Sequence, residues 1–211
     1  MKKVLSEEIA LFAICASFFA TEVEAGTLLD KSDQIVLVRA KETRAKVGFY
    51  EKNNKSHWIE KWQTSGYIGR NGLTTDKHEG DGKTPIGVYD LGLAFGVEKN
   101  PGTKIPYKEL DEKDVWVDDI NSKYYNRYVR SDIADKDWIS EEHLCNYKES
   151  YTYAIVIEYN TQPIVRGAGS AVFLHVETKE PTAGCVSIPK KYMKKFLQLL
   201  KPGAKIIITR Y

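Results

Sequence analysis

The sequence has no long apolar run and no concentrated block of charge. Nowhere does it contain the stretch of about eighteen apolar residues that a membrane-spanning helix needs. Its 31 basic and 29 acidic residues are scattered along the chain, so it lacks the basic stripe that binds nucleic acid. We therefore expect no permanent membrane span and no nucleic-acid partner.

Histidine and cysteine are also scarce. The four histidines, at positions 57, 78, 143 and 175, lack the spacing of metal ligands, so we expect no metal and no cofactor. Cys145 and Cys185 lie outside the N-terminal segment, and a disulfide between them is the alternative to free thiols. Cys185 follows small residues that a structural bridge does not need, whereas carboxylates beside Cys145 disfavour its thiolate. We predict two free thiols, with Cys145 a packed bystander.

The first 25 residues have the pattern of an export signal. Lys2 and Lys3 precede an apolar stretch over residues 9–20, and Val23-Glu24-Ala25 offers small residues where a signal peptidase cleaves. An ordinary first helix is the alternative, because two carboxylates stand before the apolar stretch. We predict a signal peptide over residues 1–25, one domain over residues 26–211, and export to the periplasm or cell wall.

The remaining chain has enough apolar residues, 42% of the total, to form one full core. Short β-branched and aromatic runs bounded by turn residues predict strands at residues 35–38, 47–50, 57–62, 84–89, 154–157, 171–174 and 204–209. Helical spacing after Pro189 and before Gly203 predicts a helix over residues 190–200. We expect a mainly β, sandwich-like domain with one helix near the C-terminus.

Between residues 97 and 150 the pattern becomes polar, aromatic and irregular. Trp116, Tyr128 and Trp138 are spread among charges, and a long loop inside a compact domain is commonly a functional lid or wall. A surface elaboration whose aromatic residues pack inward fits the same pattern. We predict a long irregular insertion over residues 97–150 and leave both roles open.

The most specific pattern is a histidine at the end of a predicted strand, followed by a cysteine behind small residues. Nine residues separate His175 from Cys185, which follows Gly184. A thiol with a pKa near 8.5 is mostly protonated at neutral pH, and a neighbouring imidazolium favours the thiolate. We predict that Cys185 is a nucleophile, mainly thiolate, and that His175 is its base and acid. Gly184, without a side chain, lets a substrate carbonyl approach the N–H groups of Cys185 and its neighbours.

Together these residues resemble the YkuD family of L,D-transpeptidase catalytic domains. That family has a Thr-Pro-x-Gly strand, a histidine and a Ser/Thr-x-Gly-Cys loop in this order, matched here by residues 82–89, His175 and residues 182–187. The resemblance covers about residues 34–211 and implies a β-sandwich-like fold. It also implies acyl transfer by Cys185 and His175, with Thr182, Ala183 and Gly184 as the oxyanion loop.

The chain departs from the family pattern at two positions of this loop. Ala183 stands where the family usually has histidine, and Ser187 stands where it usually has arginine, an expected partner of a substrate carboxylate. Arg166, Lys83 and Lys179 are candidates for the missing charge. The candidate substrate-binding residues are therefore Arg166, Ser187 and Lys83.

The function that the resemblance implies is attack by Cys185 on the amide after the third residue of a peptidoglycan tetrapeptide stem. The resulting thioester passes to an amine, giving a 3,3 crosslink or an anchored acceptor, or to water, giving a trimmed stem. A non-catalytic cell-wall-binding module, with its cysteines in a disulfide, is the alternative from another class. The sequence leaves the acceptor and the oligomeric state open.

Overall fold

The computed structural model of the chain describes residues 32–211. The predicted signal peptide over residues 1–25 lies outside this range, so its prediction stands untested. Within residues 32–211, every helix is too short or too polar to cross a membrane.

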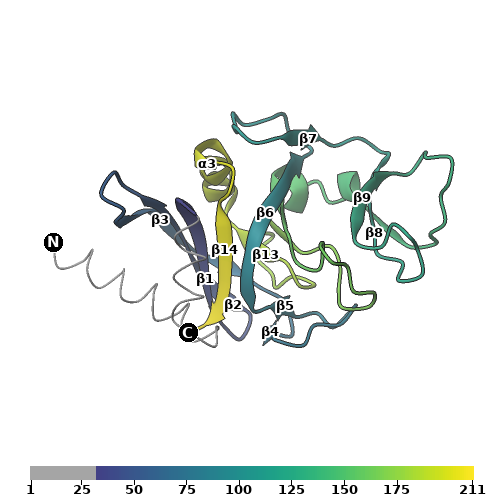
Figure 1. The fold of residues 1–211 in the computed structure, drawn as a ribbon, viewed down its shortest axis with the longest axis horizontal. Helices are drawn as coiled ribbons and strands as arrows, with labels where there is room; N and C mark the ends of the chain where they lie inside the picture. Colours follow the sequence, from purple (N-terminus) through teal and green to yellow (C-terminus); the bar gives the residue numbers. More distant parts are fainter. Residues whose placement is uncertain (1–31) are drawn as a thin grey trace.

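Nine strands form the main sheet, in the order β11-β12-β13-β3-β2-β1-β14-β6-β7. Strand β11 pairs with β6 as well as with β12, so the sheet curls and returns on itself (Figure 1). The bounds are β1 Gln34–Lys41, β2 Arg44–Lys52, β3 Trp58–Tyr67, β6 Gly87–Gly96, β7 Tyr107–Glu109, β11 Ala154–Ile157, β12 Phe173–Val176, β13 Val186–Ile188 and β14 Lys205–Arg210. The mainly β, sandwich-like fold predicted from the sequence is confirmed.

The inner face of this sheet encloses the main core, and one helix packs on it. Alternate residues of the strands, such as Val36 and Val38 of β1, point inward and are fully buried. Helix α3 (Lys190–Leu199) begins directly after Pro189, as predicted, and buries Met193 and Phe196 in the same core.

Two predicted strands have different bounds in the structure, and each difference has a local cause. The run predicted over residues 84–89 divides into β5 (Thr84–Pro85), which pairs with β4 (Leu73–Thr74), and β6, which pairs with β14. The run predicted over residues 171–174 begins as a strand only at Phe173, because Ala171 has a positive φ of 52°. The chain changes direction at both points, close to the cavity described below.

The insertion is more ordered than predicted. It contains a separate three-stranded sheet with the order β10-β8-β9, made of β8 (Asp114–Val117), β9 (Arg127–Arg130) and β10 (Glu141–His143). Short 3₁₀ helices follow at Leu144–Asn146 and Ser150–Thr152. Trp138 is buried within this unit beside Val115 and Val117, whereas the buried Trp116 packs against Phe173 of β12 in the cluster that also contains Cys185. Figure 1 shows β8 and β9 at the opposite end of the molecule from β1, β2 and β3.

Candidate active site

Strands β12 and β13 place His175 and Cys185 on the same face of the main sheet. The two strands are parallel, and His175 lies opposite Ser187, two residues beyond Cys185. Side chains alternate along a strand, so the odd-numbered residues of this pair share one face. Their neighbours Leu174 and Val186 point into the main core instead.

Cys185 is a free thiol in a nearly closed position. Its side chain makes no disulfide, and only 8% of the residue is exposed. The Phe173 N–H donates to Sγ at 3.3 Å, and Sγ donates to the Ala171 carbonyl at 3.3 Å. Cys145 is also free but half-buried, which confirms that the two cysteines are unpaired. The disulfide that a purely structural pair would form is therefore absent from residues 32–211.

His175 is held as the tautomer that leaves Nε2 with a lone pair. Its Nδ1 lies 2.8 Å from the Val176 carbonyl, and because a carbonyl only accepts, Nδ1 must carry the proton. The edge of the Tyr151 ring meets the imidazole at 5.5 Å between centroids. Only 7% of His175 is exposed. The geometry leaves Nε2 as the basic nitrogen.

The resting site favours a neutral thiol beside a neutral imidazole. Burial, together with the charge of Glu142, raises the pKa of the Cys185 thiol to about 12. Burial lowers the pKa of His175 to about 4. The prediction of a thiolate majority is therefore corrected, because desolvation disfavours both charged forms before a substrate arrives.

The loop before Cys185 is tied down by two threonine hydroxyls. Thr182 Oγ1 accepts from the Gly184 N–H at 3.1 Å and donates to the Cys185 carbonyl at 2.7 Å. The Thr84 hydroxyl donates to the Gly184 carbonyl at 2.8 Å and accepts from the Gly69 N–H at 2.8 Å. The Gly184 N–H is thus already occupied, while none of the described side chains occupies the Cys185 N–H. Thr84 belongs to the Thr-Pro pattern seen in the sequence, but its role at this loop was not predicted.

A cavity of about 330 Å³ brings the predicted site together. His175 and Cys185 line it with the three loop residues Thr182, Ala183 and Gly184. A buried thiol, a histidine whose Nε2 has no hydrogen-bond partner among residues 32–211, and a fixed loop thus share one cavity, which is the set of groups that cysteine acyl transfer uses.

A model of one known family matches almost the whole described chain. The YkuD L,D-transpeptidase catalytic domain matches residues 33–208. This chain belongs to the YkuD family. Its resemblance to that family, inferred from the His175 and Cys185 patterns, is confirmed, and the family is one of enzymes that modify peptidoglycan.

Solved structures that align with this YkuD domain are distant. The helical cell shape determining protein Pgp2 from Campylobacter jejuni, in a lysine-to-alanine variant, is 20% identical with a TM-score of 0.45, covering 85% of this chain and 47% of that one. The L,D-transpeptidase of Enterococcus faecium, in a cysteine-to-serine variant, is 12% identical with a TM-score of 0.36, covering 84% and 50%. The chain thus spans about half the length of these structures. No curated protein matches it.

The three predicted substrate-binding residues do not meet in the cavity of this YkuD domain. Arg166 Nη1 donates to the carbonyls of Ile120 and Asn121, both at 3.0 Å, in the insertion. Ser187 is buried opposite His175, and its hydroxyl has no hydrogen-bond partner among the described residues. Lys83 lies outside the cavity lining. The charges facing the substrate must come from elsewhere.

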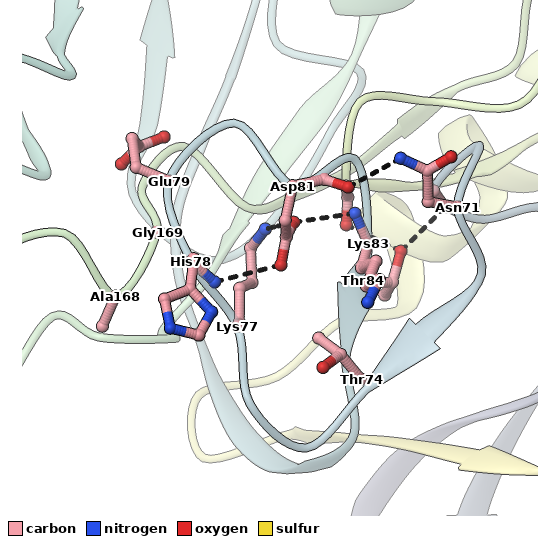
Figure 2. Close-up of polar contacts among 12 residues, drawn as sticks. Asn71, Thr74, Lys77, His78, Glu79, Asp81, Lys83, Thr84, Ala168 and Gly169 are labelled. Atoms are coloured by element: carbon pink, nitrogen blue, oxygen red, sulfur yellow. Dashed lines mark hydrogen bonds and ion pairs between the residues drawn. The ribbon is translucent and has the colours of Figure 1, made fainter.

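Two cations that the sequence analysis did not select line the cavity instead. Arg70 is exposed at the rim, whereas only 9% of Lys77 is exposed. The Lys77 ammonium lies 2.8 Å from Asp81 Oδ1. Figure 2 shows the two side chains pointing toward each other. The sequence shows a charged loop over residues 76–83, but only its folded conformation determines which of its lysines points into the cavity.

The insertion supplies carboxylates to the same cavity. Asp118 and Glu142 line it together with Tyr147 and Tyr151. Burial raises the pKa of Glu142 to about 7, although the Tyr151 hydroxyl, which donates a short hydrogen bond to its carboxylate, opposes this shift. The sequence placed Glu142 beside Cys145, but the structure turns it toward Cys185, whose pKa it raises. The proximity of Glu142 to Cys185 is visible only in the tertiary structure.

Proposed function

We propose that this YkuD domain is a cysteine acyl-transferase that acts on peptidoglycan tetrapeptide stems, with Cys185 as nucleophile and His175 as base. The observation that carries the proposal is the placement of a free Cys185 and the free Nε2 of His175 on one sheet face in one cavity. Peptidoglycan lies outside the cytoplasmic membrane, so the proposal includes export to the periplasm or cell wall, as the N-terminal pattern predicts.

The chemistry follows from these groups. The Cys185 thiol gives its proton to Nε2 of His175 as sulfur attacks the carbonyl carbon after the third stem residue. The Cys185 N–H stabilises the resulting oxyanion. When the intermediate collapses, the C–N bond breaks, His175 protonates the departing amine, and a thioester remains. An acceptor then attacks the thioester, and its proton passes to His175 as the sulfur leaves.

For the acceptor we favour an amine over water, which makes the enzyme an L,D-transpeptidase. Cys185 is almost closed to solvent, and Tyr147 and Tyr151 wall the cavity on the insertion side. Excluding water protects a thioester from hydrolysis. Hydrolysis would instead make the enzyme an L,D-carboxypeptidase that trims stems.

The test is incubation of the purified chain with a defined disaccharide-tetrapeptide, followed by mass analysis of products and protein. We expect a thioester adduct at Cys185, release of the terminal amino acid and a crosslinked product when an acceptor amine is present. The Cys185→Ala variant should give none of these. Tripeptide alone would assign the carboxypeptidase activity, and stem binding without turnover in both proteins would leave only a wall-binding module.

A further inference from the structure

Lys77 is an unusual cation because it is buried beside the reactive loop. Its side chain is only 5% exposed, and its stem packs so closely on Gly169 that a Cβ there would stand 2.8 Å from Lys77 Cε. A Cβ added at Gly184 would stand 3.4 Å from Nζ. The ammonium therefore reaches the residue next to Cys185. Burying an ammonium costs several kcal/mol unless it is matched by negative charge.

Asp81 pairs with this charge but engages only one of the three donors of the ammonium. Its carboxylate accepts from Lys77 Nζ at 2.8 Å, from the Lys83 N–H at 2.8 Å and from the His78 N–H at 3.0 Å. Burial alone would raise the pKa of Asp81, but these donors hold it below its ordinary value. Figure 2 shows the loop wrapped around this carboxylate. An ammonium has three N–H donors, and among residues 32–211 Asp81 provides the one acceptor that Nζ reaches.

The other charges of the cavity limit where an anion can sit. Glu79, Asp118, Glu142 and Glu180 all line it. Against them stand two cations, the exposed Arg70 and the buried Lys77, so a negatively charged group is attracted to these two side chains and repelled by the carboxylates. The family's usual arginine is replaced by Ser187, which leaves the anion without its expected partner in this loop.

We propose that Lys77, held in place by Asp81, is the specificity-determining residue that binds the terminal carboxylate of the stem peptide beside Cys185. This inference rests on the proposed function and names the group of the substrate that the cavity recognises. Asp81 is a positioning residue, because it fixes Nζ without contacting the peptide. The carboxylate accepts from the remaining ammonium donors and seats the scissile amide against the sulfur.

Binding is measured by calorimetry on the Cys185→Ala chain, so no turnover is needed. The probes are a stem tetrapeptide with a free C-terminal carboxylate and the same peptide with a C-terminal carboxamide. We expect the carboxylate to bind roughly 10- to 100-fold more tightly, as a charge-assisted hydrogen bond predicts. Lys77→Met, which keeps the stem packed on Gly169, should bring this ratio close to one. Lys77→Arg should restore part of the ratio.

Lys83→Met is the matched control, because Lys83 belongs to the same loop but lies outside the cavity lining. It should retain the full ratio. An unchanged ratio in Lys77→Met overturns the inference, as does an equal loss of affinity for both peptides, which would indicate a general packing role. If the methionine variant does not fold, Lys77→Gln decides by the same ratio. Failure of the proposed function has a different signature, namely no thioester at Cys185 in the wild-type chain.

Discussion

Two parts of the cavity lining differ in charge. The part supplied by β12 and the loop before β13, here called the strand wall, holds the uncharged His175 and Cys185. The part supplied by the insertion, here called the insertion wall, carries the carboxyl groups of Asp118 and Glu142. Burial keeps the Cys185 thiol and the His175 imidazole neutral on the first wall. On the second, Glu142 adds a negative charge that disfavours the thiolate further. The comparison indicates that the buried pair of His175 and Cys185 alone is a poorly reactive site. Its reactivity depends on the charges that surround it and on the substrate.

The largest effect should come from the strand wall. His175→Gln removes the base that accepts the thiol proton, and we expect acylation of Cys185 to slow by about 10²- to 10⁴-fold. The measurement is the rate of thioester formation by mass spectrometry with the tetrapeptide. His143→Gln is the matched control, because His143 pairs with Glu141 outside this cavity. A loss of less than about threefold in His175→Gln would contradict the assignment of the base.

The same substitution has a second readout in stability. The folded pKa of His175, about 4, lies below its ordinary value of 6.5, so the unfolded chain takes up a proton first as the pH falls. Stability is therefore lost as the pH falls from about 6.5 to 4. In His175→Gln this loss should disappear, as measured by chemical denaturation across the range. A similar acid loss in the variant would assign it to other groups.

The next largest effect concerns the Thr84 hydroxyl, which hydrogen-bonds the loop before Cys185. Thr84→Val keeps the shape of a fully buried side chain but removes the hydroxyl that joins Gly69 to Gly184. Leaving these two backbone groups without their partner should cost about 1–3 kcal/mol of unfolding free energy and slow acylation. Urea unfolding and the thioester rate measure the two effects. Thr209→Val is the control, since Thr209 is buried in β14 and its hydroxyl donates to the carbonyl of the adjacent Arg210, far in sequence from the reactive loop. Equal effects in both variants would refute a special role for Thr84.

Removing a carboxylate from the insertion wall should make the Cys185 thiol more reactive, whereas the substitutions in the strand wall make it less reactive. Glu142→Gln removes a charge that raises the Cys185 pKa, so we expect alkylation by iodoacetamide to accelerate about three- to tenfold. Glu141→Gln is the control, because Glu141 is on the same strand but bonds Trp138 and Lys136 away from the cavity. A slower reaction in Glu142→Gln would reverse the assigned sign.

The stability of the Glu142 variant should also depend on pH. The folded pKa of about 7 lies above the ordinary 4.5, so the unfolded chain releases its proton first as the pH rises. Glu142 thus lowers stability progressively between about pH 4.5 and 7, by at most about 3 kcal/mol. Between about pH 4.5 and 6.5, the contributions of Glu142 and His175 to the free energy of unfolding therefore change with pH in opposite directions. Because of this opposition, the check is a difference: by chemical denaturation, Glu142→Gln should gain stability relative to the wild-type chain as the pH rises from about 4.5 to 7.

The sequence predicted the strand wall far better than the insertion wall, and the reason is physical. His175 and Cys185 lie near the ends of adjacent strands with strong apolar patterns, and the family order of motifs fixes their relation. The strands and helix α3 followed from β-branched runs and from Pro189. In contrast, β8 to β10 carry mixed polar and aromatic residues whose burial depends on tertiary packing, so the insertion looked irregular.

The sequence could not predict which charged residues line the cavity, for a related reason. Which lysine of residues 76–83 points inward depends on the turn that Asp81 ties, and Lys77 rather than Lys83 is buried. Glu142 reaches Cys185 through the fold of the insertion, across 43 positions of sequence. Charge has no periodic pattern that marks its partner, whereas hydrophobic residues do.

The smallest predicted effect separates the charge of Glu142 from the ring contact of Tyr151. Tyr151→Phe keeps the ring edge against His175 but removes the hydroxyl that donates to Glu142. That hydrogen bond lowers the Glu142 pKa, so without it more of the carboxyl is protonated at neutral pH and less charge faces the thiol. We expect alkylation of Cys185 to accelerate about twofold near neutral pH.

Near pH 9 the acceleration should vanish, because Glu142 is then ionised with or without the hydrogen bond. Glu142→Gln should accelerate alkylation at both pH values, since it removes the charge altogether. Tyr153→Phe is the control, because its hydroxyl bonds Glu98 outside the cavity. If Tyr151→Phe changed the rate equally at both pH values, the ring or the local packing would be responsible. The two walls would then be coupled through the contact with His175 and not through the carboxylate.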